Sequence, residues 1–273
     1  MLYLDSSNIS ILTNLKISTI DSIALLYKYL SVKDKIIIYQ PWGGLGDNLA
    51  HTIIPRLCKT NNIECLLSKE IACRNKEIYD FVWKDNPDIT GRTDEIDMTW
   101  CDNRPYEAKR KDYNEIQAIQ KTHGFEPITE YPHIHYTPNK VDKFEGKTVI
   151  DISGFSLGKR SHPSLIKDAI ASLGLKVNDT IELSHSQVQY GKAYPVCIDF
   201  HNEDVNDFFT YSNILYSCKR YITLNNGPAT LASAIKNKMN TDCDINILTP
   251  PEYMPGVREG GYTYSNTNYI QLG

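Results

Sequence analysis

The sequence lacks a long apolar stretch and lacks an excess of positive charge. No run of about 18 apolar residues occurs, so we expect no membrane-spanning helix. The first ten residues, MLYLDSSNIS, do not combine a basic start with an apolar run, and we therefore expect no secretory signal peptide. The formal net charge is −4, which argues against a broad nucleic-acid-binding surface.

The sequence also lacks paired cysteines. Its seven cysteines are odd in number and never form a C-x-x-C pair; they are Cys58, Cys65, Cys73, Cys101, Cys197, Cys218 and Cys243. This pattern predicts reduced thiols in a cytoplasmic protein, with neither a disulfide framework nor a zinc site. The many Ile, Lys, Asn and Tyr residues are typical of AT-rich genomes, including those of phages, so the compartment would be the host cytoplasm if the source is viral.

What is present is an ordinary globular composition with alternating strands and helices. The chain has 273 residues, of which 41% are hydrophobic and 23% charged, enough for a sizeable core. Apolar β-branched runs and helical periodicity alternate in both halves, which predicts an α/β protein with parallel sheets covered by helices. Strands are expected at residues 35–40, 63–67, 148–152, 180–183, 196–200, 221–224 and 245–248. Helices are expected at residues 18–30, 49–58, 76–83, 112–123, 164–172, 204–217 and 229–236.

Two domains are expected. Residues 132–146 hold prolines and charges with little periodicity, which is typical of a linker. We therefore predict an N-terminal Rossmann-like domain over residues 1–140 and a C-terminal one over residues 141–273.

A glycine-rich loop follows the first predicted strand. It reads Gly43-Gly44-Leu45-Gly46-Asp47-Asn48, and its glycines let the backbone approach a ligand closely. The dinucleotide pattern G-x-G-x-x-G fails because Leu49 stands in the third glycine's place. Asp47 is therefore either a helix cap or a general base at the edge of a cleft. His51, one helical turn later, either shares that proton or is a partly buried histidine.

Two further loops of the second half combine phosphate-binding features. Lys159 and Arg160 lie in a short loop before a predicted helix, and arginine suits bidentate contact with phosphate. Asn225, Asn226 and Gly227 form a turn between a strand and a helix, where backbone amides and the helix dipole favour an anion. Taken alone, each loop is also compatible with a plain solvated loop or turn.

The three loops together resemble the heptosyltransferase-like glycosyltransferases, over about residues 35–248. Gly44-Leu45-Gly46-Asp47 is similar to the family's Gly-Leu-Gly-Asp loop. Arg160-Ser161-His162-Pro163 is similar to its Lys-x-Trp-Pro element. Residues 225–232 (NNGPATLA) are similar to its Asp-Ser/Thr-Gly-Pro-x-His-Leu-Ala element, with Asn225 and Thr230 in place of the acid and the histidine.

The resemblance implies a GT-B architecture of two Rossmann-like domains facing across a cleft, and a transferase that uses a nucleotide-diphosphate sugar without metal or resident cofactor. It implies Asp47 as general base and Arg160, Asn226 and Gly227 as contacts of the donor phosphates, with the donor base near Ser184 and His185. Beside these residues we expect Gly44, Gly46, Lys159 and Asn225 at the donor site, and His51 as a second catalytic candidate. The acceptor would be a glycan, a lipid-linked sugar or, in a phage, a modified DNA base.

Two other functions fit the same architecture. One is a nucleotide-sugar epimerase, which would need further carboxylates and a histidine in the cleft. The other is a nucleotide- or glycan-binding protein without catalysis, which the departures at Asn225 and Thr230 keep open.

Overall fold

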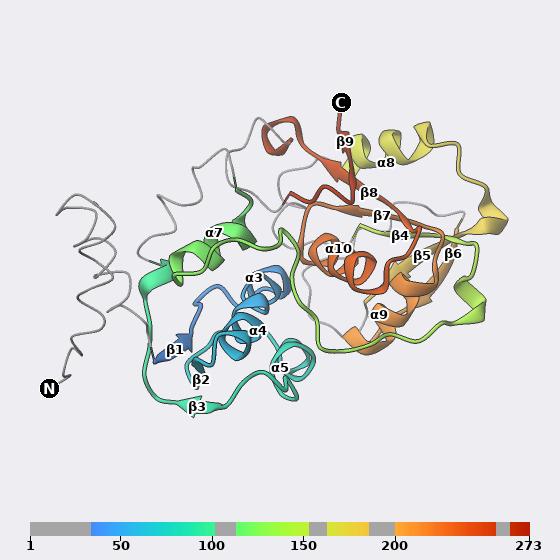
Figure 1. The fold of residues 1–273 in the computed structure, drawn as a ribbon. Helices are drawn as coiled ribbons and strands as arrows, with labels where there is room; N and C mark the ends of the chain where they lie inside the picture. The colour runs from blue at the N-terminus through green and yellow to red at the C-terminus, as the bar shows by residue number, and fades with distance from the viewer. Residues whose placement is uncertain (1–33, 102–112, 153–162, 186–199, 255–262) are drawn as a thin grey trace, which may run out of the picture.

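Two parallel β-sheets organise the chain, and this confirms the predicted α/β class (Figure 1). The computed structural model describes residues 34–101, 113–152, 163–185, 200–254 and 263–273. The first sheet has the order β1-β2-β3, with strands Lys35–Ile38, Glu64–Ser68 and Gly91–Thr93. The second has the order β6-β5-β4-β7-β8-β9, and its strands β4 to β9 are Thr148–Asp151, Thr180–Ser184, His201–Asp204, Arg220–Leu224, Asp244–Thr249 and Asn268–Gln271.

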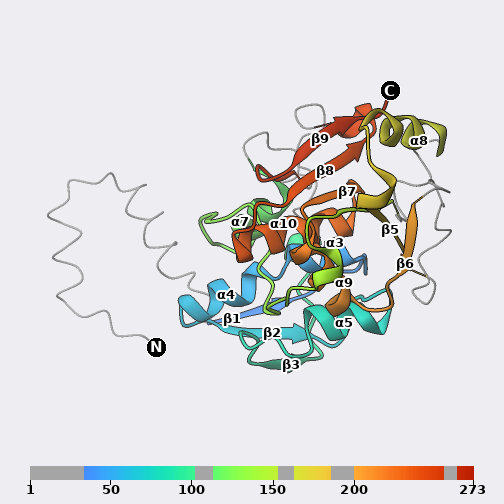
Figure 2. The ribbon, with the colours of Figure 1, turned by 90° about the vertical axis from the view of Figure 1, so that its right-hand side faces the viewer.

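Helices cover the sheets and fill the space between them. They are α3 (Leu45–Ala50), α4 (Ile53–Thr60), α5 (Lys76–Val82), α7 (Glu115–Thr122), α8 (Pro163–Ser172), α9 (Phe208–Ser217) and α10 (Gly227–Met239). Short 3-10 turns occupy Asp142–Phe144, Val177–Asp179 and Pro251–Tyr253. Helices α3 and α10 lie side by side between the two sheets in both views (Figures 1 and 2).

Alternation along the strands of the second sheet sorts apolar side chains to two faces. Val149 and Tyr221 join the core that also contains the first sheet and helices α3, α9 and α10. Their neighbours Ile150 and Ile222 join a separate cluster under α8. One continuous core therefore links the two sheets, while the division at residues 140 and 141 stays a prediction.

The helix after the glycine-rich loop starts earlier, and breaks at another place, than the sequence predicts. A bend was expected near Pro55 within residues 49–58, but α3 already starts at Leu45 and the break falls at His51 and Thr52. Pro55 has no N–H and would clash with the carbonyl of His51 in a continuous helix. Placing Pro55 in the first turn of α4 removes this conflict, and the His51 carbonyl instead accepts the Ile54 N–H at 3.1 Å.

Three strands were missed by the sequence-based prediction. One is β6 (His201–Asp204), and α9 starts at Phe208 behind an Asp207 cap, later than the expected Asp204. The strand expected at residues 196–200 lies outside the described residues except for Phe200. Strands β3 and β9 are short and only partly buried, so their apolar pattern is weak. The helix expected at residues 18–30 lies outside the described residues.

The two halves meet where Gly46, in the first turn of α3, packs against Gly227 at the start of α10. A Cβ added at Gly227 would lie 2.9 Å from the Gly46 backbone nitrogen and 3.0 Å from the Leu45 Cβ. A Cβ added at Gly46 would lie 3.3 Å from the Gly227 Cα. Such close approach of two backbones leaves no room for a side chain at position 227.

We expect Gly227→Ala to lower the free energy of unfolding by about 1–3 kcal/mol, because the new methyl group overpacks this contact. Alanine otherwise favours a helix over glycine, so helix propensity alone predicts the opposite sign. Denaturant unfolding of Gly227→Ala beside Gly46→Ala measures the effect, and the second variant should lose less. A Gly227→Ala protein as stable as the parent would contradict the contact.

Candidate functional site

The strand order of the second sheet fixes where a ligand is expected. From β4 the chain moves outward to β5 and β6, and it then returns to β7 beside β4 and moves outward on the other side. This order creates a topological switch point between β4 and β7, and ligands of open parallel sheets bind outside the carboxyl ends of the strands there. Asp151 ends β4, and Asn225 follows β7.

The turn after β7 presents a helix N-terminus at this switch point. Asn226 is the N-cap of α10, and its side-chain oxygen accepts the Ala229 N–H at 3.4 Å. Gly227 is the first helical residue, which leaves backbone amides of the first turn without carbonyl partners inside the helix. Asn225, Asn226 and Gly227 are all half-buried, so part of the turn is exposed, and a helix N-terminus favours an anion.

The glycine-rich loop is held rigidly by a buried side chain at its start. The Gln40 amide donates to the Ala72 carbonyl at 2.6 Å, and its oxygen accepts the N–H groups of Trp42 and Gly43 at 2.9 and 3.2 Å. Gly43 has a φ of +72°, a left-handed conformation that favours glycine. The loop therefore has one defined shape, with the Trp42 side chain 38% exposed on it.

Asp47 lies in the first turn of α3, beside the contact between the two halves. Its carboxylate accepts the Gly44 N–H at 3.2 Å, and the residue is half-buried. The next residue, Asn48, is buried and donates to the Gly44 carbonyl at 2.9 Å, while its oxygen accepts the Trp83 indole N–H at 2.6 Å. Asp47 thus caps its helix, as one of the two sequence-based interpretations expects. It also lies next to the contact with α10, and its role as general base stays a prediction.

His51 is buried, with only 1% of its surface exposed. Its Nδ1 lies 2.9 Å from the Asp47 carbonyl, and its ring meets the edges of the Trp100 and His123 rings at centroid distances of 6.1 and 6.4 Å. This geometry ties His51 to the backbone of Asp47. It gives the histidine a positioning contact with the turn that carries Asp47.

A buried polar network that the sequence analysis missed lies at the carboxyl end of β4. Asp151 is fully buried, and its Oδ2 accepts the His185 Nε2–H at 3.0 Å. The same oxygen accepts the Tyr211 hydroxyl, whose oxygen in turn contacts the Tyr221 hydroxyl. The sequence signal was available, because an aspartate directly ends an apolar strand at residue 151.

The network favours a protonated His185 and keeps its two tyrosines neutral. Burial alone would lower the pKa of His185, but the charge and hydrogen bond of Asp151, with the Val205 carbonyl and Asp204, raise it. Burial, and then the charge of Asp151, raise the pKa values of Tyr211 and Tyr221 well above their ordinary value. The arrangement favours an imidazolium paired with a carboxylate at the carboxyl ends of β4 and β5, with both phenols neutral.

The remaining predicted donor-site residues divide into two groups. Ser184, at the end of β5, donates to Asn202 at 2.8 Å and to Asp204 at 3.3 Å, which ties β5 to β6. Lys159 and Arg160 lie outside the described residues. The structure thus brings Gly46 against Gly227, with Asp47 following Gly46 in the first turn of α3. Ser184 and His185 lie at the carboxyl end of β5, which β4 separates from β7.

The part of the chain that the structure describes contains neither a cluster of metal ligands nor a membrane-spanning helix. There, no three His, Cys, Asp or Glu side chains gather as a metal ion would require. No helix among those residues is long and apolar enough to cross a membrane.

We expect the Asp151–His185 pair to make stability depend on pH. Because the folded pKa of His185 is raised, its stabilising contribution is complete below the unfolded value of about 6.5 and is lost as pH rises through the folded pKa. His185→Gln should flatten this pH dependence and lower the free energy of unfolding by about 1–3 kcal/mol at low pH. Urea unfolding across the pH range tests this, with His201→Gln as control because the His201 side chain is 63% exposed. An unchanged pH slope in His185→Gln would contradict the pair.

Comparison with solved structures identifies the fold. The chain is similar to the bacterial iron-containing dodecameric glycosyltransferase TibC from enterotoxigenic E. coli H10407, at 14% identity and a TM-score of 0.50 over 78% of this chain and 57% of that one. It is similar to the same heptosyltransferase in complex with ADP-D-beta-D-heptose, with a TM-score of 0.56 over 88% of this chain and 64% of that one at 14% identity.

A third match is a glycosyl transferase family 9 structure from Veillonella parvula DSM 2008, with 12% identity and a TM-score of 0.50 over 87% of this chain and 84% of that one. No protein-family model matches the sequence, and no curated protein does. The chain spans about 57–64% of the length of the two TibC structures. At these identities the likeness shows the fold: this chain has the GT-B, Rossmann-like architecture that solved heptosyltransferase structures share.

Proposed function

We propose that this protein transfers a sugar from a nucleotide-diphosphate donor to an acceptor hydroxyl. The observation that carries the proposal is the backbone contact between Gly46 and Gly227. It brings the turn that holds a half-buried carboxylate, Asp47, against the N-terminus of α10. A base and an anion-binding turn from opposite halves are the two parts that such a transfer needs.

The donor side of the proposal lies on the second sheet. The amides at Asn226 and Gly227 and the dipole of α10 receive the diphosphate, and Lys159 and Arg160 neutralise its charge. One dipole interaction contributes only about 0.3–1 kcal/mol, so several donors must act together. Ser184 and His185 lie at the end of β5, where the nucleoside would extend along the same edge.

The acceptor side lies on the first half. Trp42 lies 38% exposed on the anchored loop that leads to Asp47, and both sugar rings and nucleobases stack on aromatic rings. This ring suits each proposed acceptor class: a glycan, a lipid-linked sugar or a modified DNA base. Acceptor and donor would meet at the contact between α3 and α10.

The chemical step is a displacement at the anomeric carbon. The acceptor oxygen forms a bond to that carbon while the bond from carbon to the diphosphate oxygen breaks, with inversion and without a metal. Asp47 takes the acceptor proton, and the amides and cations of the second half stabilise the leaving diphosphate. His51 holds the backbone of Asp47 through its Nδ1 and so orients the turn that carries the base.

The free thiols bear on the compartment in which the protein acts. The six cysteines of the described residues are free thiols, which fits a reducing compartment. We therefore propose a cytoplasmic enzyme, or one of the host cytoplasm if the source is viral, with an acceptor domain over residues 1–140 and a donor domain over residues 141–273.

We expect Asp47→Asn to fold, to bind donor nucleotide like the parent and to lose transfer by about 10²–10⁴-fold. The asparagine oxygen still accepts the Gly44 N–H, so the helix cap survives. The measurement is product formation with a nucleotide-sugar donor and an acceptor, beside nucleotide binding by calorimetry.

Asp207→Asn is the matched control, because Asp207 is also a half-buried cap, here of α9, and accepts the Thr210 N–H at 2.7 Å. It should keep full activity. Full transfer activity in Asp47→Asn would show that Asp47 is not the general base. Donor assayed without acceptor separates the alternatives, since an epimerase converts it, a transferase hydrolyses it slowly, and a binding protein leaves it intact.

A further inference from the structure

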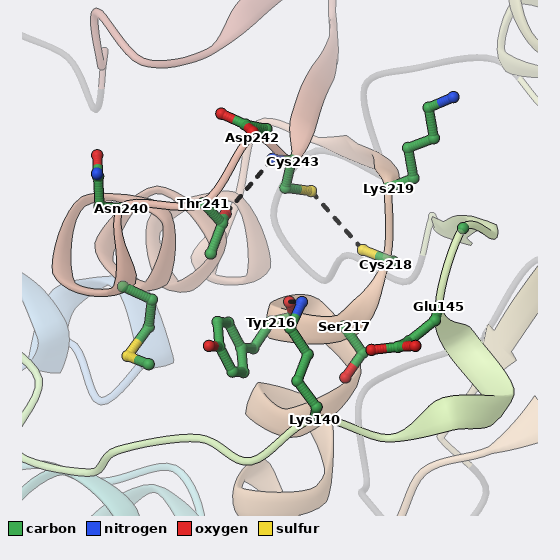
Figure 3. A pocket seen from close by; sticks show the side chains of 12 residues that line it. Lys140, Glu145, Tyr216, Ser217, Cys218, Lys219, Asn240, Thr241, Asp242 and Cys243 are labelled. Atoms are coloured by element: carbon green, nitrogen blue, oxygen red, sulfur yellow. Dashed lines mark hydrogen bonds between the residues drawn. The ribbon is translucent and has the colours of Figure 1, made fainter.

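A hollow of about 470 Å³ lies at the opposite, amino-terminal edge of the second sheet (Figure 3). Its walls are the segments that lead into β4, β7 and β8, together with the end of α10. Lys140, Glu145, Tyr216 and Lys219 line it, and so do two cysteines, Cys218 and Cys243. The proposed transfer uses none of these residues.

The two cysteines face each other across neighbouring strands. Their Sγ atoms are 3.7 Å apart, and Figure 3 shows both thiols pointing toward one another. Cys218 directly follows α9, while Cys243 directly precedes β8, and the paired residues Arg220 and Asp244 fix the register between their strands. Both cysteines are 4–5% exposed, so only a small reagent entering through the hollow reaches them.

The surroundings make the two thiols unequal. The hydrogen bond from Cys218 lowers the pKa of Cys243, and Lys236 and Lys140 lower it further, against burial and the charge of Asp244. The pKa of Cys218 is raised well above its ordinary value by the hydrogen bond to Cys243 and by burial. The charges of Lys236 and Lys140 near Cys243 favour a thiolate there, and the thiolate is the reactive form of cysteine.

A second pair of cysteines in the same chain provides a contrast. Cys58 and Cys65 are both 0% exposed within the apolar core. The hydrogen bond between them and burial raise the pKa of Cys65 far above its ordinary value. This second pair is therefore also hydrogen-bonded, but both of its thiols lie wholly inside the apolar core.

We propose that Cys218 and Cys243 form an oxidative modification site, at which a small peroxide converts the two thiols into a reversible disulfide. This inference does not depend on the proposed function. The Cys243 thiolate attacks one oxygen of hydrogen peroxide, the O–O bond breaks, and the departing hydroxide takes a proton to become water. The Cys218 sulfur then attacks the Cys243 sulfenic acid, the S–S bond forms, and the S–O bond breaks to release a second water. Two electrons pass from the two thiols to one peroxide.

The test treats the folded full-length chain with limiting hydrogen peroxide and maps its peptides without reduction. We expect a mass loss of about 2 Da and a linked pair of peptides containing Cys218 and Cys243, both reversed by dithiothreitol. Cys58 and Cys65 should stay reduced at the same dose. No linked Cys218–Cys243 peptide after peroxide has oxidised other groups, or equal linking of Cys58 and Cys65, would overturn the proposal.

Single variants test the order of attack. In Cys218→Ser, dimedone should trap a sulfenic acid at Cys243, because no second thiol remains to resolve it. In Cys243→Ser, Cys218 should react at least about tenfold more slowly, because its burial still keeps the thiolate scarce. Equal trapping in both variants would refute Cys243 as the attacking sulfur. Circular dichroism shows whether each variant is folded, and the peptide map of the parent protein decides the disulfide itself.

Discussion

The close backbone contact between Gly46 and Gly227 is the constraint on which the rest of the structure depends. Two helices from different sheets approach each other there at their N-termini, and neither position has space for a side chain without displacement of its neighbour. The contact sets the distance between the two sheets and lets one apolar core run through both. Asp47 follows Gly46 and Asn226 precedes Gly227, so the same contact that packs the two helices also brings the proposed base near the proposed anion-binding turn.

The strand order of the second sheet supplies the second constraint. Because β4 and β7 are neighbours while their connections run to opposite sides, the carboxyl ends of these strands form an open edge. Asp151 is fully buried at that edge and holds His185 and Tyr211. A buried carboxylate is costly unless it is paired, and the pairing here orders the end of β5, where the donor nucleoside is proposed to extend.

Much of this organisation could be predicted from the sequence. The strands near residues 36 and 222 are short apolar runs in a parallel sheet, where local pattern and tertiary burial agree. The turn at Asn226 was also predictable, since Asn-Gly-Pro between a strand and a helix favours an N-cap followed by an early proline.

The rest depended on contacts distant in sequence. The break between α3 and α4 comes from a clash that Pro55 would make with the carbonyl of residue 51, and its position depends on where α3 begins. The short edge strands β3 and β9 carry little apolar signal and are defined by their partners. The approach of Gly46 to Gly227 and the pairing of Asp151 with His185 join separate elements, so no local pattern reveals them.

The central claim is that a nucleoside diphosphate binds where the two halves meet. The most direct measurement is thermal unfolding with a panel of nucleoside diphosphates, nucleotide sugars and the corresponding nucleosides. A ligand at 100 times its Kd adds about 2.7 kcal/mol to stability, and the account predicts that at least one diphosphate and its sugar conjugate raise Tm clearly while the matching nucleoside has much less effect. A panel in which no nucleotide raises Tm, or in which the nucleoside stabilises as much as its diphosphate, would contradict it.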